Sequence, residues 1–127
     1  MNRFQGSIPI LSVKDVAASI RYYVDRLGFK KHWEWGDPPT FAAITRDAVE
    51  IYLCKDTQGH PGTWVYVAVE DVDALYAEFL ASGAEIRQPP TNLPWHMREI
   101  NVADPDGHRL RFGTPTSAPP SGTLIED

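Results

Sequence analysis

The sequence predicts an α+β fold built from two consecutive βαβββ modules. The composition is that of one folded domain, because 43% of the 127 residues are hydrophobic and 23% are charged, whereas disordered chains are poorer in apolar side chains. A Val-x-Asp-Val motif occurs twice at a constant spacing of 56 residues, at 13–16 and again at 69–72. Each copy stands between a strand-like and a helix-like segment, so one supersecondary unit is present twice.

The first module begins with a strand at residues 8–13, which are rich in β-formers. Asp15 follows, and its carboxylate can accept a free backbone N–H of a first helical turn. The helix then places apolar side chains on one stripe, at Val16, Ile20, Tyr23 and Leu27. Gly28 ends this helix, and three further strands are predicted at 29–35, 41–45 and 49–54.

The second module repeats this order. A strand at 64–69 leads to Asp71, and a helix follows with an apolar stripe formed by Val72, Leu75, Phe79 and Leu80. Gly83 occupies the position that favours a left-handed residue after a helix. Three strands are predicted at 84–88, 98–103 and 108–113, and the Asp-Pro-Asp-Gly sequence at 104–107 is typical of a tight turn.

These elements define a single domain at residues 1–113, with modules at about 7–55 and 63–113. Residues 114–127 hold three of the eleven prolines together with small and polar residues. We expect this tail to be flexible or to lie on a neighbouring surface.

Alternation along the strands divides the side chains between a helix-covered core and an open face. The side chains expected in the core are Leu11, Val13, Ile51, Leu53, Val65, Val67 and Val69. The open face is aromatic, and strands and loops of less regular pattern add to it. The predicted ligand-binding residues are Ile8, Ile10, Trp33, Trp35, Phe41, Glu50, Tyr52, Trp64, Tyr66, Trp95, His96, Arg109 and Arg111.

Other roles remain open for several of these residues. The aromatic side chains could instead fill a closed core or a subunit interface. Arg109 and Arg111 could orient a carboxylate or a phosphate, or pair with Glu50 across the sheet. Glu99 suits either the cleft or a structural ion pair. His108 alternates with core positions, and we expect it to be a packed histidine.

Several segments together resemble the glyoxalase and bleomycin-resistance superfamily. They are the strand start at 8–11, the YYVDRLGF sequence at 22–29, residues 74–79, Trp95 with Arg98 and Glu99, and the DPDGHRLRF sequence at 104–112. The likeness is greatest to the bleomycin-resistance branch and runs from about Ser7 to Phe112. It implies that the two modules form a curved mixed sheet around a cleft.

The metalloenzymes of this superfamily take their metal ligands from the first and last strand of each module. Matched to that pattern, the four positions are occupied by Ile8, Tyr52, Trp64 and Arg111. Isoleucine, tryptophan and arginine offer no suitable lone pair to a divalent cation. The four histidines are also scattered, without helical pairing. We therefore expect no metal and no other cofactor.

The resemblance implies a metal-independent binding protein that sequesters a planar aromatic, partly charged compound such as a glycopeptide antibiotic. This interpretation favours a binding protein over an enzyme. The alternative is an enzyme of the same fold, a lyase, isomerase or dioxygenase with an unrecognised active site.

Charge and composition bear on the partners. Twelve Lys and Arg against seventeen Asp and Glu give a net charge of −5, which disfavours nucleic acid. The apolar segments are too short to span a membrane, Met1–Ser7 lacks the apolar stretch of a signal peptide, and Cys54 is the only cysteine. We expect a cytoplasmic homodimer whose partner is a small planar or amphipathic ligand, because the apolar module faces need covering and Pro9 suits an edge or exchanged strand.

Overall fold

The computed structural model describes residues 2–126, so Met1 and Asp127, the ends of the predicted domain and tail, lie outside the described residues. Ten elements follow the predicted order. They are β1 (Ile10–Val13), α1 (Val16–Leu27), β2 (Lys30–Trp35), β3 (Phe41–Arg46), β4 (Val49–Lys55), β5 (Trp64–Ala68), α2 (Val72–Ser82), β6 (Glu85–Asn92), β7 (Met97–Ala103) and β8 (Arg109–Pro115).

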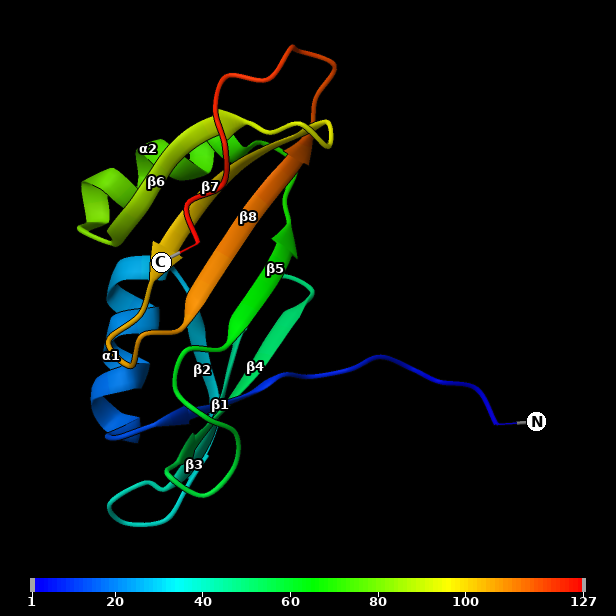
Figure 1. Cartoon of the computed structure of the whole chain (residues 1–127). Coiled ribbons are helices and arrows are strands. Elements are labelled where there is room, and N and C mark those ends of the chain that lie inside the picture. The colour runs from blue at the N-terminus through cyan, green and yellow to red at the C-terminus, as the bar shows by residue number, and fades with distance from the viewer. Residues whose placement is uncertain (1, 127) are drawn as a thin grey trace.

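The two βαβββ modules are confirmed, and each forms its own four-stranded mixed sheet. The strand orders are β1-β4-β3-β2 and β5-β8-β7-β6, with the first two strands of each order parallel and the others antiparallel. No strand pair joins the two sheets within residues 2–126. Both helices lie together on one side of the molecule, where α1 contacts α2 (Figure 1).

The repeated motif has the same structural role in both modules. Asp15 and Asp71 are N-caps in extended backbone, and each accepts a hydrogen bond from the N–H three residues on, at 3.0 and 3.1 Å. Gly28 and Gly83 end the helices in left-handed conformations, with φ of 73° and 79°. Capping, more than the intervening sequence, therefore sets the helix bounds.

One hydrophobic core serves both modules. It joins α1 and α2 to the inner faces of both sheets, and its largest buried members include Tyr23, Leu27, Phe79, Leu110 and Phe112. Leu11, Val13, Ile51, Leu53 and Val67 are buried as predicted, while Val65 and Val69 are partly buried and pack against the core.

Three strands differ from the sequence prediction by two or more residues at one end. Ile8 and Pro9 precede β1, because proline has no N–H for a ladder, although the Pro9 carbonyl still accepts a hydrogen bond from the Tyr52 N–H at 2.9 Å. β6 continues to Asn92 through two prolines, which an edge strand tolerates. β8 extends to Pro115, so Thr114 and Pro115 belong to the strand.

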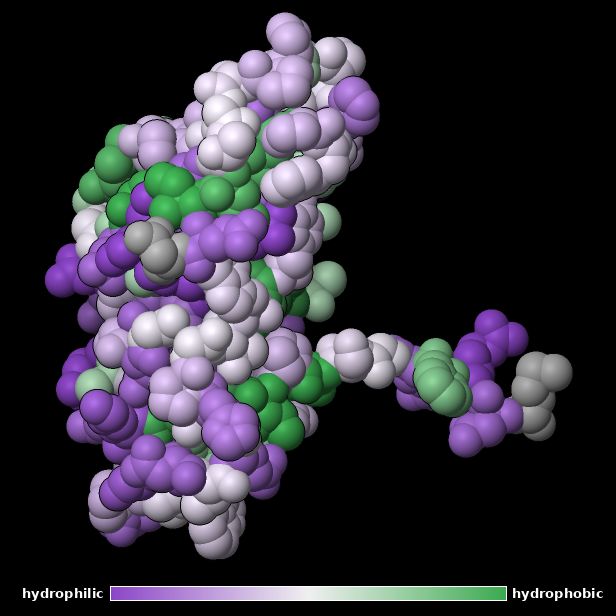
Figure 2. Space-filling model, viewed as in Figure 1, coloured by the Kyte–Doolittle hydropathy of each residue, from purple (hydrophilic) through white to green (hydrophobic). Residues whose placement is uncertain are grey.

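Residues 2–9 form an arm that leaves the body of the molecule (Figures 1 and 2). Phe4 in the arm is 94% exposed, and Ile8 and Ile10 at its base are more than one-third exposed. Apolar surface shows where the arm joins the body (Figure 2). Neither helix within residues 2–126 has the length and apolar character needed to cross a membrane.

Candidate ligand-binding site

Three aromatic rings meet on the helix-free face of the first sheet. Trp33, Phe41 and Tyr52 come from three adjacent strands, and their ring centroids are 5.3 Å apart in edge-to-face arrangements. Ala43, which lies between Trp33 and Tyr52 in the strand register, is too small to separate the rings. Such rings give a stiff apolar wall suited to a flat partner.

An open hollow of about 610 Å³ adjoins this wall. Trp35 and Phe41 line it, together with Cys54 and the start of the loop after β4. Trp35 is 71% exposed, a large apolar area for a tryptophan to leave in water. The hollow therefore offers a stacking surface within the volume range of small-molecule sites.

Glu50 lies beside this aromatic group and binds a histidine. Its carboxylate is 2.8 Å from Nδ1 of His32. The sequence left open a pair between Glu50 and an arginine across the sheet, and the structure places both cleft arginines on the other sheet. Glu50 thus supplies negative charge to the first sheet only.

Arginines stack on aromatic rings along the second sheet. The Arg109 guanidinium carbon lies 5.8 Å from the Trp64 ring centroid, and that of Arg111 lies 5.2 Å from Tyr66 and 5.7 Å from Trp95. The register pairs Trp64 with Arg109 and Tyr66 with Arg111, which explains two of these contacts. Trp64, Tyr66 and Trp95 are each more than 40% exposed, so their outer surfaces are free for a ligand.

Glu99 neutralises one of the two arginines. It is 2% exposed, and its Oε1 accepts a hydrogen bond from Arg111 Nε at 2.9 Å and lies 2.7 Å from Arg111 Nη2 in an ion pair. Its other oxygen accepts a bond from Trp95 Nε1 at 2.9 Å. Partial burial, and after it the charge of Glu99, raises the pKa of the Tyr66 hydroxyl. Glu99 therefore forms a structural ion pair with Arg111, and its hydrogen bond to Trp95 holds that side chain in place.

Arg109 retains donor capacity. Its Nη1 is buried and has no hydrogen-bond partner within residues 2–126. Nη1 itself is not exposed, but the residue is partly exposed and no carboxylate within residues 2–126 forms an ion pair with its guanidinium, which therefore suits a carboxylate or a phosphate. The second sheet thus combines a neutralised arginine with one that can still bind an anionic group.

His96 lies at the edge of this group. It is exposed, has a φ of +65°, and its carbonyl accepts a hydrogen bond from the Thr116 N–H at 3.0 Å. His108, by contrast, is fully buried as predicted. Thr63 N–H donates to its Nδ1 at 3.0 Å, so its Nε2 carries the proton and donates to the Ser12 carbonyl at 2.7 Å.

The predicted ligand-binding residues therefore divide into two groups. Those on or next to the first sheet are Ile8, Ile10, Trp33, Trp35, Phe41, Glu50 and Tyr52, and those on or next to the second are Trp64, Tyr66, Trp95, His96, Arg109 and Arg111. Strand alternation assigns a side chain to one face of its sheet but does not show how the faces of two sheets lie relative to each other. The prediction from the sequence therefore placed both groups in one cleft.

Two buried polar residues of the second sheet were not among the residues predicted from the sequence. Gln88 and Asn101 are 5% and 1% exposed, and the β6–β7 register pairs them. A β-bulge between Ile86 and Gln88 turns Gln88 away from the core face that Ile86 occupies. Alternation with Ile100 and Val102 could have indicated Asn101, whereas no sequence signal marks the bulge.

The side chains at the superfamily's metal positions do not suit a divalent cation. Ile8 and Trp64 offer no lone pair, and Arg111 is a cation held by Glu99. Within residues 2–126, no group of three or more histidine, cysteine, aspartate or glutamate side chains is arranged to hold a metal ion.

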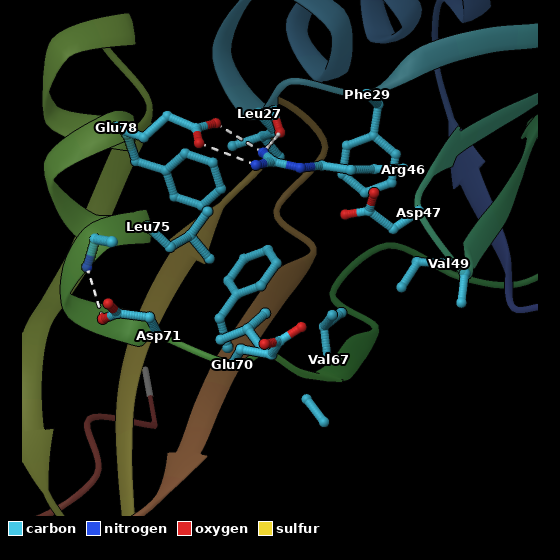
Figure 3. A pocket seen from close by; sticks show the side chains of 16 residues that line it. Leu27, Phe29, Arg46, Asp47, Val49, Val67, Glu70, Asp71, Leu75 and Glu78 are labelled. Carbon is cyan, nitrogen blue, oxygen red and sulfur yellow. Dashed lines mark hydrogen bonds and ion pairs between the residues drawn. The ribbon is translucent and has the colours of Figure 1, made fainter.

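A second hollow, of about 430 Å³, lies between the modules on their helical side (Figure 3). Its floor is apolar, and carboxylates of Asp47, Glu70, Asp71 and Glu78 lie around it. Arg46 spans the modules there, with its guanidinium bound to Glu78 at 2.7 and 2.9 Å. This ion pair lowers the pKa of Glu78. The hollow contains none of the predicted ligand-binding residues.

The repeat explains why this hollow exists. At the equivalent junction, where the turn before β8 meets the end of β1, His108 fills the space and Asp106 accepts a hydrogen bond from the Lys14 N–H at 2.9 Å. At the hollow, the corresponding residues are Val49, Asp47 and Glu70. The smaller Val49 and the acidic Glu70, in place of His108 and Lys14, leave this junction open.

The fold and the site define a protein of the glyoxalase class whose metal positions lack suitable donors. Residues 4–112 match the family model described as the Glyoxalase/Bleomycin resistance protein/Dioxygenase superfamily. The chain therefore belongs to this superfamily. It is 32% identical to the bleomycin resistance proteins of Geobacillus stearothermophilus and Staphylococcus aureus, over 84% of this chain and 93% of theirs.

Solved structures agree on the fold. The bleomycin-binding protein of bleomycin-producing Streptomyces verticillus, complexed with copper(II)-bleomycin, superposes with a TM-score of 0.73 at 28% identity, over 94% of this chain and all of that one. TioX from Micromonospora sp. ML1 superposes with a TM-score of 0.75 at 24% identity, over 87% of this chain and 99% of that one. The latter likeness concerns the fold alone.

Proposed function

We propose that this protein binds and sequesters a planar aromatic, partly charged compound without chemical conversion, as a resistance protein against a glycopeptide antibiotic of the bleomycin type. The observation that carries the proposal is the aromatic wall of Trp33, Phe41 and Tyr52 beside the exposed Trp35. Relatives named bleomycin resistance protein and a bleomycin-binding structure support it.

The charges of the site support a ligand of mixed polarity. Glu50 offers a carboxylate near the first aromatic group, and Arg109 offers a partly exposed guanidinium without an ion-pair partner in the described residues, beside Trp64 on the second sheet. A flat ring system gains about 0.5–1.5 kcal/mol per stacked pair beyond burial, and the charged groups then orient the rest of the molecule.

We also propose that the protein is a cytoplasmic homodimer without nucleic-acid or membrane partners. The exposed arm and the apolar side chains at its base leave surface that a second copy would cover. The net charge of −5 repels a phosphate backbone. Sedimentation equilibrium at micromolar concentration tests the assembly, and a monomer would contradict it.

The function is tested by titrating the protein with copper(II)-bleomycin and with metal-free bleomycin. Binding should quench tryptophan fluorescence and raise the melting temperature, since ligand at 100 times Kd adds about 2.7 kcal/mol to the free energy of unfolding. We expect Trp35→Ala to raise Kd by about tenfold, equivalent to about 1.4 kcal/mol.

Leu80→Ala is the matched control, because Leu80 is 56% exposed on α2, away from both aromatic groups. It should leave Kd unchanged. The absence of any shift with either form of the drug would overturn bleomycin as the ligand, and a Kd unaffected by Trp35→Ala would overturn the stacking site.

A further inference from the structure

The C-terminal tail folds back over the second sheet on the face opposite the helices. After β8 it turns, and the Ser121 N–H donates to the Asn92 carbonyl at 2.8 Å while Ser121 Oγ accepts from the Asn92 N–H at 2.8 Å. The tail then crosses β6 and β7, where it is seen as the red segment in Figure 1. It thus covers part of the face that carries Arg111 and Tyr66.

Buried side-chain amides hold the tail by its main chain. Gln88 Nε2 donates to the Thr123 carbonyl at 2.8 Å, and Gln88 Oε1 accepts from the Ile125 N–H at 2.9 Å. Asn101 Nδ2 donates to the Ile125 carbonyl at 3.1 Å. One amide group therefore serves both the carbonyl and the N–H that face one side of an extended chain, as a neighbouring β-strand would.

The two amides have few other partners. Asn101 Oδ1 is buried and has no hydrogen-bond partner within residues 2–126, and besides the tail Gln88 has one long contact, 3.4 Å to Thr91 Oγ1. Buried polar groups are normally satisfied, and a group left without a partner marks either strain or an unfilled role. The pair therefore retains acceptor capacity for one more donor.

The tail itself is held loosely. Ser121, Gly122, Thr123, Ile125 and Glu126 are exposed, and only Leu124 is partly buried. Segments with few buried apolar contacts open at low free-energy cost. Because the bonds to Gln88 and Asn101 involve main-chain atoms only, they do not depend on the side chains of the tail.

We propose that Gln88 and Asn101 form a binding site for an extended amide backbone and that residues 121–126 are its tethered, displaceable occupant. Asn101 is paired in register with Arg111, whose guanidinium stacks on Tyr66 and Trp95. A ligand with a ring on those aromatics and an amide-bearing arm reaches the site only by releasing the tail. This last step rests on the proposed function, whereas the amide site itself does not.

The amide site is tested in the full-length chain with a synthetic peptide of residues 119–126, labelled at its N-terminus. Ile125→Pro removes the N–H that Gln88 binds and so frees the site without touching the core. A short flexible tether gives the native tail an effective concentration on the order of 1 mM. We therefore expect the peptide to bind Ile125→Pro at least about tenfold more tightly than wild type, measured by fluorescence anisotropy.

Gln88→Met in the Ile125→Pro background should abolish peptide binding, and Gln58→Met, in the exposed loop between the two modules, should not. In the otherwise unaltered chain, Gln88→Met should also remove the hydrogen-exchange protection of the Ile125 amide. Equal peptide affinity for wild type and Ile125→Pro, or no binding to Ile125→Pro up to about 1 mM, would overturn the proposal.

Bleomycin separates the two proposals. If it binds, the Ile125 amide should lose its protection from exchange as the drug saturates the protein. A bound drug with the amide still protected overturns tail displacement alone. If the drug does not bind, bleomycin is overturned as the ligand, while the peptide result still decides the amide site.

Discussion

At the residue scale, a few buried polar side chains connect the two modules. Tyr23 in α1 donates its hydroxyl to Oδ2 of Asp104 at 2.8 Å, and Oδ1 of Asp104 accepts from the N–H groups of Asp106 and His108. Burial raises the pKa of Asp104, and the bonds from Tyr23 and His108 oppose that rise. Burial therefore destabilises the charged form of Asp104, and the hydrogen bonds from its neighbours partly offset this effect.

Tyr23→Phe should destabilise the fold in a pH-dependent way. Because the pKa of Asp104 is raised on folding, this carboxyl favours the folded state at low pH, and the advantage disappears as pH rises through its folded pKa. Removing the hydroxyl raises that pKa further. We expect a loss of about 1–3 kcal/mol in the free energy of unfolding at pH above the folded pKa of Asp104, and a smaller loss at pH below it, measured by urea denaturation.

Tyr22→Phe is the control for this experiment. The Tyr22 hydroxyl donates to the Ala103 carbonyl at 2.7 Å and accepts from the Glu85 N–H, so it also joins the modules but through uncharged partners. The loss of unfolding free energy caused by Tyr22→Phe should therefore be nearly constant with pH. A Tyr23→Phe loss equally independent of pH would show that the Asp104 carboxylate does not depend on this bond.

At the element scale, the repeated cap residues made the fold predictable from one sequence. Asp15 and Asp71, with Gly28 and Gly83, fix both ends of both helices, and the spacing between the copies aligns the strands around them. Those signals are local, since a cap needs only its own first turn. The order of elements and most of the core were therefore predictable.

The features that the sequence did not reveal depend on contacts between distant segments. Continuation of β6 through Pro89 and Pro90 depends on its being an edge strand, and the orientation of Gln88 depends on a bulge relative to β7. The path of the tail likewise depends on Asn92 and Gln88. Period-two reasoning fails at a bulge, because the bulge reverses the faces beyond it.

Both helix caps should contribute similarly to stability. We expect Asp15→Ala and Asp71→Ala each to lower the free energy of unfolding by about 1 kcal/mol, because each leaves a first-turn N–H without its acceptor. Asp25→Ala, near the end of α1, should cost less, since a negative charge there gains nothing from the helix dipole. Losses no larger than that of Asp25→Ala would contradict the capping role.

At the scale of the whole molecule, the exposed aromatic residues are divided between the two sheets. Each module offers its own aromatic face, with a carboxylate at Glu50 on one and a free guanidinium at Arg109 on the other. The two sheets share no strand pair within residues 2–126, yet their inner faces share one core. The two aromatic faces can therefore differ in chemistry while the modules remain one folding unit.

This single core predicts one cooperative unfolding transition. Trp33 and Trp35 report on the first module, and Trp64 and Trp95 on the second. In a Trp64→Phe, Trp95→Phe chain and in a Trp33→Phe, Trp35→Phe chain, the fluorescence midpoint in urea should coincide with the midpoint from circular dichroism of the same chain. Three side-chain hydrogen bonds join the modules, and neither module can unfold without breaking them. They link Arg46 to Glu78, Tyr23 to Asp104 and His108 to Ser12. A fluorescence transition that separates from the circular dichroism transition in either chain would mean that the modules unfold independently.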